Sequence, residues 1–403
     1  MEKQILRKTD APFKKNWNID EPLNGLMERA GLLEKVGSEF KVIVSDLRDF
    51  LEETKRDLDT EELKIRFEEN RLHIIDYSDL VNVAEKIVSG YINKAVFKMN
   101  QLVTHFTPAE HTVHRGYFQR YLHPLLLLSP FINRAYSKPL GFPGDYQMMN
   151  MIYGDHDQGE SFFAFLLNRY SCRLTAARAV AGRVPYLIRR IDHTIDRVLR
   201  KKEDVSIASI GAGPAGEIQE LIQTNSKSDQ CHVSLVDMIP EALSYCQEKM
   251  FDLKMATGSR IQVDFLNRSV RDLIRSPYAL DSLMNRDLIY AIGLFDYLPF
   301  QVAKHVVQKL YRLLSEGGEL IIGNFDISND SRYYMEYAAE WFLLYRSEDE
   351  MIDLAEGLPA DSQISIERDE SGAQLYLVIR KCHRMGQSLS PHPGMAAVSY
   401  GKP

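Results

Sequence analysis

The sequence predicts an α/β fold: a sheet of seven strands that alternate with helices, preceded by a helical N-terminal domain. From Val205 onward, short apolar runs alternate with amphipathic segments, which is the pattern of consecutive βα units. Before that point, apolar residues recur every three or four positions, which indicates helices. We expect strands near residues 205–210, 232–237, 260–264, 288–292, 319–324, 362–367 and 374–379. The last two lie close together and predict an antiparallel final hairpin.

The composition is that of a folded protein large enough for two domains, with 403 residues, 45% of them hydrophobic and 26% charged. A net charge of -7 provides no positive field for nonspecific nucleic-acid binding. The 4 cysteines form no CxxC pair, so we expect neither a disulfide framework nor a cysteine zinc site. No apolar run approaches the length of a membrane span. These features predict a soluble, cytoplasmic protein that binds no nucleic acid.

Changes in pattern divide the chain into four predicted segments. Residues 1–103 form a helical module, because apolar and charged residues alternate with heptad-like spacing. Residues 104–200 form a helical cap or lid segment that contains the loop KPLGFPGDY. Residues 201–382 form the α/β domain, and residues 383–403 form a small, polar, flexible tail. We expect the N-terminal helices to pack on one another or to join two copies in a homodimer.

The stretch VSIASIGAGPAGEIQELI combines an apolar strand, a glycine turn and an amphipathic helix. Gly211, Gly213 and Gly216 allow a ligand to lie against bare backbone, where the helix N-terminus offers free N–H groups. Asp237 ends the next strand, where a carboxylate can accept hydrogen bonds from both hydroxyls of a ribose. Together these features predict a nucleoside-containing cofactor. They leave open whether it is S-adenosylmethionine, a flavin or a nicotinamide dinucleotide.

Features further along the chain favour S-adenosylmethionine. The stretch DLIYAIGLFDYLPFQVAKHVVQKLYRLLSEGGELIIGNF, with a strand, a loop, a helix, a GG turn and a further strand, resembles class I S-adenosylmethionine-dependent methyltransferases. The resemblance implies a Rossmann-like seven-stranded methyltransferase sheet. It also implies that Asp264 binds the adenine amino group, that Phe265 lies beside the ring, and that Met238 and Gly293 contact the cofactor.

Ser209 departs from this class, in which an acidic residue often stands two positions before the first glycine. The departure concerns one cofactor contact. Two other functions stay open at this point: a flavin- or nicotinamide-dependent oxidoreductase, and a noncatalytic scaffold that binds the cofactor without turnover.

Three stretches resemble a particular bacterial family, the extracellular-factor 3-hydroxypalmitate methyl ester biosynthesis proteins. They are HRGYFQRYLHPLLLLSPFINRAYSKPLGFPGDYQMMNMIY, IGAGPAGEIQELI with LVDM, and GNFDISNDSRYYMEYAAEWFLLYRSEDEM. The resemblance extends from about Thr104 to Lys381. It implies methyl transfer to a small molecule, for which a fatty-acid carboxylate is the best-known acceptor.

The loop KPLGFPGDYQ has the composition of a lid or a substrate clamp. Prolines fix its path, glycines permit close approach of a ligand, and Lys138, Asp145 and Tyr146 provide polar groups. We expect Lys138 and Asp145 to contact the acceptor and Tyr146 to contact the methionine part of the cofactor. The alternative is a rigid turn between two helices.

The segment after the fifth strand combines aromatic walls with polar anchors and predicts the acceptor pocket. Its candidate substrate-binding residues are Asn324, Tyr334, Trp341 and Arg346. Arg346 can bind an acceptor carboxylate with two hydrogen bonds, and Glu336 and Tyr337 can orient or deprotonate an acceptor. The alternative is a helix face buried in a core, because the aromatic residues are three or four positions apart.

Four histidines, His105, His111, His114 and His123, cluster before this loop. His111 and His114 can share one helix face, but we expect no metal, because packed or capping histidines are more common than such a site. His114 is our candidate for a catalytic base, since Arg115 and Tyr117 lie beside it.

Overall fold

The computed structural model of the chain describes residues 31, 34–69, 78–154, 156–275 and 282–382. These residues form two compact units. The helical unit comprises the described residues up to Gly182 together with Ser328–Leu343. The sheet unit comprises Arg183–Ile327 together with the described residues from Leu344 onward. The predicted flexible tail, 383–403, lies outside the described residues.

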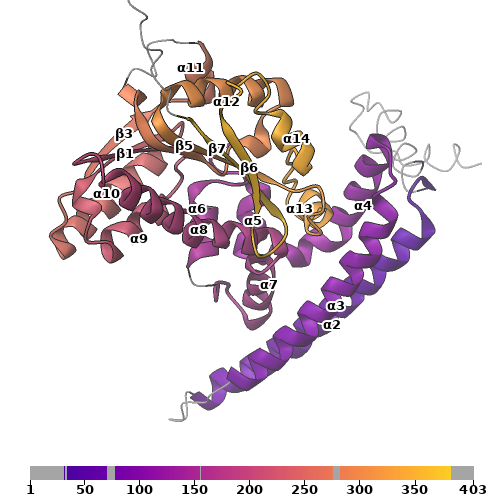
Figure 1. Cartoon of the computed structure of the whole chain (residues 1–403). Coiled ribbons are helices and arrows are strands. Elements are labelled where there is room, and N and C mark those ends of the chain that lie inside the picture. The colour runs from indigo at the N-terminus through magenta and orange to yellow at the C-terminus, as the bar shows by residue number, and fades with distance from the viewer. Residues whose placement is uncertain (1–30, 32–33, 70–77, 155, 276–281, 383–403) are drawn as a thin grey trace, which may run out of the picture. The chain divides into compact units, whose positions relative to one another are not determined.

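The sheet unit contains one sheet with the strand order β3-β2-β1-β4-β5-β7-β6 (Figure 1). The strands are β1 (Val205–Ile210), β2 (Cys231–Asp237), β3 (Gln262–Asn267), β4 (Arg286–Ala291), β5 (Leu314–Phe325), β6 (Gln363–Arg368) and β7 (Gln374–Arg380). Strands β1 to β5 pair in parallel, whereas β7 is antiparallel to both β5 and β6. The predicted seven-stranded sheet with its antiparallel final hairpin is confirmed. Dinucleotide-binding sheets have the order 3-2-1-4-5-6, so an antiparallel strand between β5 and β6 distinguishes this one.

Helices cover both faces of the sheet, so the apolar core of this unit has two halves. The helices are α9 (Gly216–Thr224), α10 (Pro240–Thr257), α11 (Val270–Arg275), α12 (Phe300–Leu313), α14 (Glu348–Asp353) and the end of α8 (Thr175–Val198). Successive side chains of a strand point to opposite faces. Ile207 therefore packs with residues of α8, α9 and α10, whereas Ala208 packs with residues of α12 and α14.

The helical unit is built from amphipathic helices. They are α2 (Ser38–Glu69), α3 (Ser78–Val103), α4 (Pro108–Leu126), α5 (Pro130–Ser137), α6 (Tyr146–Tyr153), α7 (Phe162–Cys172), the first part of α8, and α13 (Arg332–Ala338). The buried residues Phe40, Val44, Leu47 and Leu51 recur along one face of α2, which packs against α3, α4 and α7. The predicted helical N-terminal domain is confirmed. None of the helices in the described ranges is both long enough and apolar enough to cross a membrane.

The short helix α5 lies between α4 and the KPLGFPGDY loop. Helix α5 begins at Pro130 because the hydroxyl of Ser129 accepts a hydrogen bond from the Ile132 N–H and Pro130 occupies the first helical position. The loop after α5 ends at Asp145, whose side chain caps α6.

Candidate functional site

The glycine turn connects β1 to α9 at the carboxyl edge of the sheet. Gly211 and Gly213 have φ angles of 72° and 55°, and Ala215 follows with 51°, so the turn uses the left-handed region where glycine is favoured. A Cβ atom added to Gly213 would meet no atom within 4 Å. Gly216 begins α9 directly after this turn. The backbone thus faces open space next to a helix N-terminus, as a ligand contact requires.

Asp237 is the last residue of β2 and lies beside this turn. Its carboxylate accepts hydrogen bonds from the N–H groups of Gly213 and Ile239, both at 2.9 Å. The residue is 9% exposed, and burial raises the pKa of its carboxyl group. Each carboxylate oxygen keeps a lone pair beyond these bonds, so Asp237 can also accept hydrogen bonds from ribose hydroxyls. The side chain of Met238, which follows, is 56% exposed and offers an apolar surface to a base.

The prediction for Asp264 is wrong because the third strand ends later than the sequence pattern indicated. Asp264 lies in the middle of β3, opposite Ser234, and not at the ligand edge of the sheet. Its carboxylate pairs with His232 at 2.7 Å, and Phe265 packs against the apolar core. Asn267 ends the strand instead. It lies opposite Asp237, and its side-chain N–H donates to the Asp237 carbonyl at 3.1 Å.

A buried carboxyl group lies near Ser209, although position 209 itself has none. The hydroxyl of Tyr290 in β4 donates to Oε1 of Glu217 at 2.8 Å, and it also interacts with the Ser209 hydroxyl. Burial raises the pKa of Glu217, which stands in the first turn of α9. The sequence motif did not identify this residue, because its partner Tyr290 comes from a distant strand.

The carboxyl edge of β4 carries a second set of buried charges. Gly293 follows the strand, and a Cβ atom placed on it would lie 3.4 Å from Nη1 of Arg183 in α8. Nη2 of Arg183 is 3.8 Å from the carboxylate of Asp296, and burial raises the pKa of Asp296 to about 6. The sequence did not indicate Arg183 or Asp296, because only the fold brings α8 to the end of β4.

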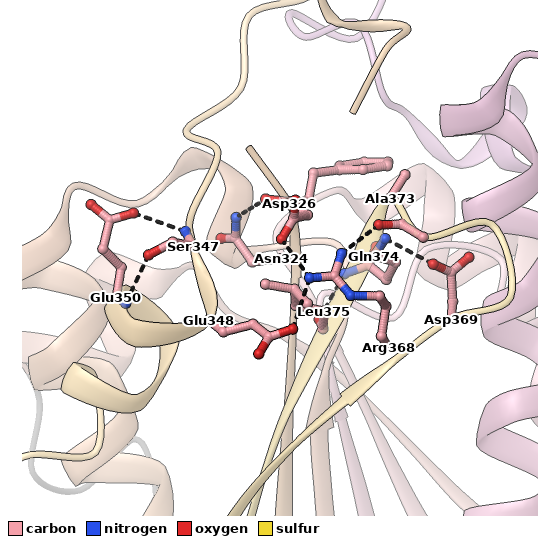
Figure 2. Close-up of polar contacts among 12 residues, drawn as sticks. Asn324, Asp326, Ser347, Glu348, Glu350, Arg368, Asp369, Ala373, Gln374 and Leu375 are labelled. Carbon is pink, nitrogen blue, oxygen red and sulfur yellow. Dashed lines mark hydrogen bonds and ion pairs between the residues drawn. The ribbon is translucent and has the colours of Figure 1, made fainter. Parts of the chain in front are cut away.

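The neighbouring edge of β5, β7 and β6 is closed by internal polar contacts (Figure 2). Arg368 binds the carboxylates of Asp326 at 3.1 Å and Glu348 at 2.8 Å. The backbone N–H of Gln374 donates to Asp369 at 2.9 Å. These contacts hold the strand ends together and leave Gln374 in a fixed position.

The predicted substrate contacts of Asn324 and Arg346 are wrong, because the protein itself uses their polar atoms. Arg346 donates from Nη1 to the Phe295 carbonyl at 2.8 Å and to the Asn324 side chain, and from Nη2 to the Leu298 carbonyl. The Asn324 amide donates to the Phe325 and Leu344 carbonyls, both at 2.9 Å. Both side chains are buried. They join loops of the sheet unit and are not available to an acceptor.

In the helical unit, Asp145 has a structural role that contradicts the predicted acceptor contact. Its carboxylate caps α6 through the N–H groups of Gln147 and Met148 and also binds Arg134 through two hydrogen bonds, at 3.0 and 2.8 Å. Lys138 ends α5, and its Nζ atom is 3.7 Å from Glu340. The roles predicted for Lys138 and Tyr146 stay predictions.

His114 is also structural, so its predicted catalytic role is wrong. Its Nδ1 atom is 2.8 Å from the Glu110 carbonyl oxygen, and its Nε2 atom accepts the Gly37 N–H at 3.1 Å. Both ring nitrogens are therefore occupied in a buried side chain. His111 differs: its Nδ1 atom is 3.0 Å from the Tyr337 hydroxyl, and no described residue bonds to Nε2. Burial lowers the pKa of His111, which keeps the ring neutral.

The aromatic residues of α13 and of the segment that follows it mostly form a core. Tyr334 is buried with its ring 5.7 Å from that of Tyr170, and Trp341 is buried with its ring 6.4 Å from that of Phe131. Their predicted substrate contacts are thus corrected to packing. Glu336 binds Nε of Arg332 at 2.9 Å, and the catalytic roles of Glu336 and Tyr337 stay predictions. Across the described ranges, no group of three or more histidine, cysteine or acidic side chains can hold a metal ion.

The fold and the glycine turn define a Rossmann-like protein with a site for a nucleoside-containing cofactor. S-adenosylmethionine fits this site, because Gly213 faces open space and the buried Asp237 carboxylate has lone pairs available for a ribose. Residues 201–363 match the family of methyltransferase domains. These residues therefore form an S-adenosylmethionine-dependent methyltransferase domain. The alternative of a flavin or nicotinamide oxidoreductase is set aside.

The solved structures that match this chain share little sequence with it. A possible exported protein from Bordetella parapertussis is 14% identical with a TM-score of 0.46, covering 69% of this chain and 99% of that chain. Magnesium protoporphyrin IX methyltransferase from Synechocystis PCC 6803, with SAH bound, is 13% identical with a TM-score of 0.39, and the match covers 62% of this chain and 98% of that chain. N-methyltransferase NodS from Bradyrhizobium japonicum WM9 is 14% identical with a TM-score of 0.31, and the match covers 49% of this chain and 98% of that chain. No curated protein matches the chain by sequence. Likeness at this level assigns no substrate.

Proposed function

We propose that this methyltransferase modifies a small molecule whose methyl acceptor is a carboxylate, a hydroxyl or an amine. The open space over Gly213, beside the buried Asp237 carboxylate, is the observation that carries the proposal, because it provides the cofactor site. A net charge of -7 disfavours a nucleic-acid acceptor. The resemblance to 3-hydroxypalmitate methyl ester biosynthesis proteins makes fatty-acid carboxylates the first acceptors to test.

The residues of the chain have mainly to bind the cofactor and the acceptor, to align the two and to exclude water. When bound, S-adenosylmethionine supplies a methyl group that its sulfonium charge has already activated. The glycine turn and Asp237 hold the nucleoside, so that the reacting groups meet in a fixed orientation. A carboxylate acceptor needs no base, because it is ionised near neutral pH. A hydroxyl or amine acceptor needs a proton acceptor.

Candidates for such a base lie in both units. In the helical unit, the neutral ring of His111 is hydrogen-bonded to Tyr337, and Glu336 lies next to Tyr337 in the chain. In the sheet unit, the carboxyl group of Asp296 has a pKa of about 6, which suits proton exchange near neutral pH. A requirement for one of these residues would point to a hydroxyl or amine acceptor.

Calorimetric titration with S-adenosylmethionine and S-adenosylhomocysteine tests the cofactor site. We expect Asp237→Ala to weaken both ligands about 10- to 100-fold, because charge-assisted hydrogen bonds to the ribose are lost. Asp252→Ala is the matched control, since Asp252 is an exposed carboxylate on α10 of the same unit. Absence of binding to the folded, cofactor-free wild type would overturn the cofactor site.

A radiolabelled methyl group then identifies the acceptor. The wild-type chain is incubated with labelled cofactor and with fatty acids, 3-hydroxy fatty acids, amino acids, amines or phenols, and with RNA and protein as the competing classes. Label in a small molecule supports the proposal, and saturable transfer only to RNA or protein contradicts it. Tight cofactor binding without transfer to any acceptor would favour a noncatalytic scaffold.

A further inference from the structure

Arg183 is a buried cation at the carboxyl edge of β4, and it is 8% exposed. It belongs to the sheet unit, in the middle of α8 and ahead of β1. We infer that Arg183 binds the carboxylate at the methionine end of S-adenosylmethionine. The inference rests on the proposed cofactor site and extends it to a residue outside the glycine motif.

The guanidinium group of Arg183 is held in one orientation. Its Nε and Nη2 atoms both donate to Oε1 of Gln374, at 3.1 and 2.7 Å. Gln374 is itself fixed, because its side-chain amide donates to the Leu375 carbonyl at 3.1 Å. The Arg183 guanidinium carbon also lies 5.2 Å from the centre of the Phe325 ring. The cation is therefore preorganised, and rotation of the side chain would break two hydrogen bonds.

One nitrogen of this group is left for a ligand. No residue in the described part of the chain accepts a hydrogen bond from Nη1 of Arg183, which faces Gly293 at the end of β4. Asp296 lies 3.8 Å from Nη2, which is beyond hydrogen-bonding distance. An anionic ligand can therefore accept a charge-assisted hydrogen bond from Nη1.

The order of the strands indicates which anion reaches Arg183. Asp237 at the end of β2 is on one side of the glycine turn after β1, and Gly293 at the end of β4 is on the other side. A Cβ atom on Gly211 would lie 3.6 Å from Leu294, so the ends of β1 and β4 adjoin. A cofactor with its ribose at Asp237 thus extends its amino-acid end across the turn toward Gly293 and Arg183.

The test compares ligands with and without the amino-acid end. S-adenosylhomocysteine, its decarboxylated analogue and methylthioadenosine are titrated into the wild type, Arg183→Gln and Arg183→Lys. We expect Arg183→Gln to weaken S-adenosylhomocysteine about 10- to 100-fold and to change the affinity for the other two ligands less than about 3-fold. Arg183→Lys keeps the charge but loses the guanidinium geometry, so its effect should be intermediate. The control is Arg189→Gln, which removes an exposed arginine from the same helix.

Each other outcome overturns the inference. Equal weakening of all three ligands would make Arg183 a purely structural residue, and unchanged affinity for S-adenosylhomocysteine would mean that Nη1 faces another group. If the Arg183 variants fail to fold, Gly293→Ala decides, because its methyl group lies 3.4 Å from Nη1 and should impair only the carboxylate-containing ligand. Failure of the cofactor site itself is distinguishable, since the wild type would then bind none of the ligands.

Discussion

Two buried arginines at one edge of the sheet illustrate how a binding residue differs from a structural one. Arg346 donates to the Phe295 and Leu298 carbonyls and to Asn324, so both of its terminal nitrogens are hydrogen-bonded within its own unit. Arg183 donates only to Gln374 and keeps Nη1 without a partner among the described residues. Burial alone therefore does not identify a ligand contact. The number of donors that the protein leaves unused is the better criterion.

Removing Arg346 should produce the largest effect on stability. In Arg346→Met the Phe295 and Leu298 carbonyls and the Asn324 side chain lose their donor while still buried. We expect the free energy of unfolding to fall by about 3–5 kcal/mol, because each unsatisfied buried group costs about 1–3 kcal/mol. Urea denaturation followed by circular dichroism measures it.

Arg368→Gln provides the control for Arg346→Met. Arg368 forms ion pairs at the same edge, with the exposed Glu348 and the buried Asp326, and its own side chain is 38% exposed, so its loss should cost less, about 1–2 kcal/mol. Where Arg346→Met is folded, its affinity for S-adenosylhomocysteine should match that of the wild type. Specific loss of cofactor affinity in a stably folded Arg346→Met protein would erase the distinction between the two arginines.

Asp296 tests whether the charge of Arg183 is compensated within the protein, because its carboxylate lies 3.8 Å from Nη2 of Arg183. Burial raises its pKa to about 6, above the unfolded value of about 3.9. Between these pH values the folded state binds more protons than the unfolded state, so this group makes stability fall as pH rises. Asp296→Asn should remove that slope and raise the free energy of unfolding by about 1–2 kcal/mol at pH 7, with little change at pH 4.

Urea titrations of wild type and Asp296→Asn at several pH values measure this difference, and the contributions of all other groups cancel in the comparison. The Asn side chain can still accept the Phe325 N–H, which Asp296 accepts at 2.7 Å. A variant that is less stable than the wild type at pH 7 would show that the ionised carboxylate is needed to compensate Arg183.

Sequence reasoning succeeded where the signal is local. The alternation of apolar runs indicated all seven strands, and the strand–glycine–helix pattern indicated the turn after β1, beside which Asp237 lies. The end of β3 was misplaced because this edge strand is only partly buried and has no continuous apolar run. Because of this error, the residue predicted for the adenine contact, Asp264, lies within the strand, and Asn267 stands at its end.

The contacts of the buried charged groups at the carboxyl ends of β4 and β5 could not be predicted from the sequence. Arg183 and Gln374 are 191 positions apart, and only the sheet brings them together. Arg346 was a plausible carboxylate ligand by residue type, but the carbonyls that satisfy it lie 48 and 51 positions earlier in the chain, and only the fold brings them together. Residue type predicts what a side chain can bind, whereas the fold decides whether its donors are still unused.

The smallest expected effect applies the same criterion to two carboxylates. Asp237 is buried at the ligand edge, whereas the Asp264 side chain is 53% exposed and pairs with His232 within the strands. Asp264→Asn should therefore change the affinity for S-adenosylhomocysteine less than about 2-fold and the free energy of unfolding by at most about 0.5 kcal/mol. Asn267→Ala should weaken the ligand about 3- to 10-fold, since it removes a polar group next to Asp237. Calorimetry on both variants decides between the two positions, and a large loss in Asp264→Asn alone would restore Asp264 as the adenine contact.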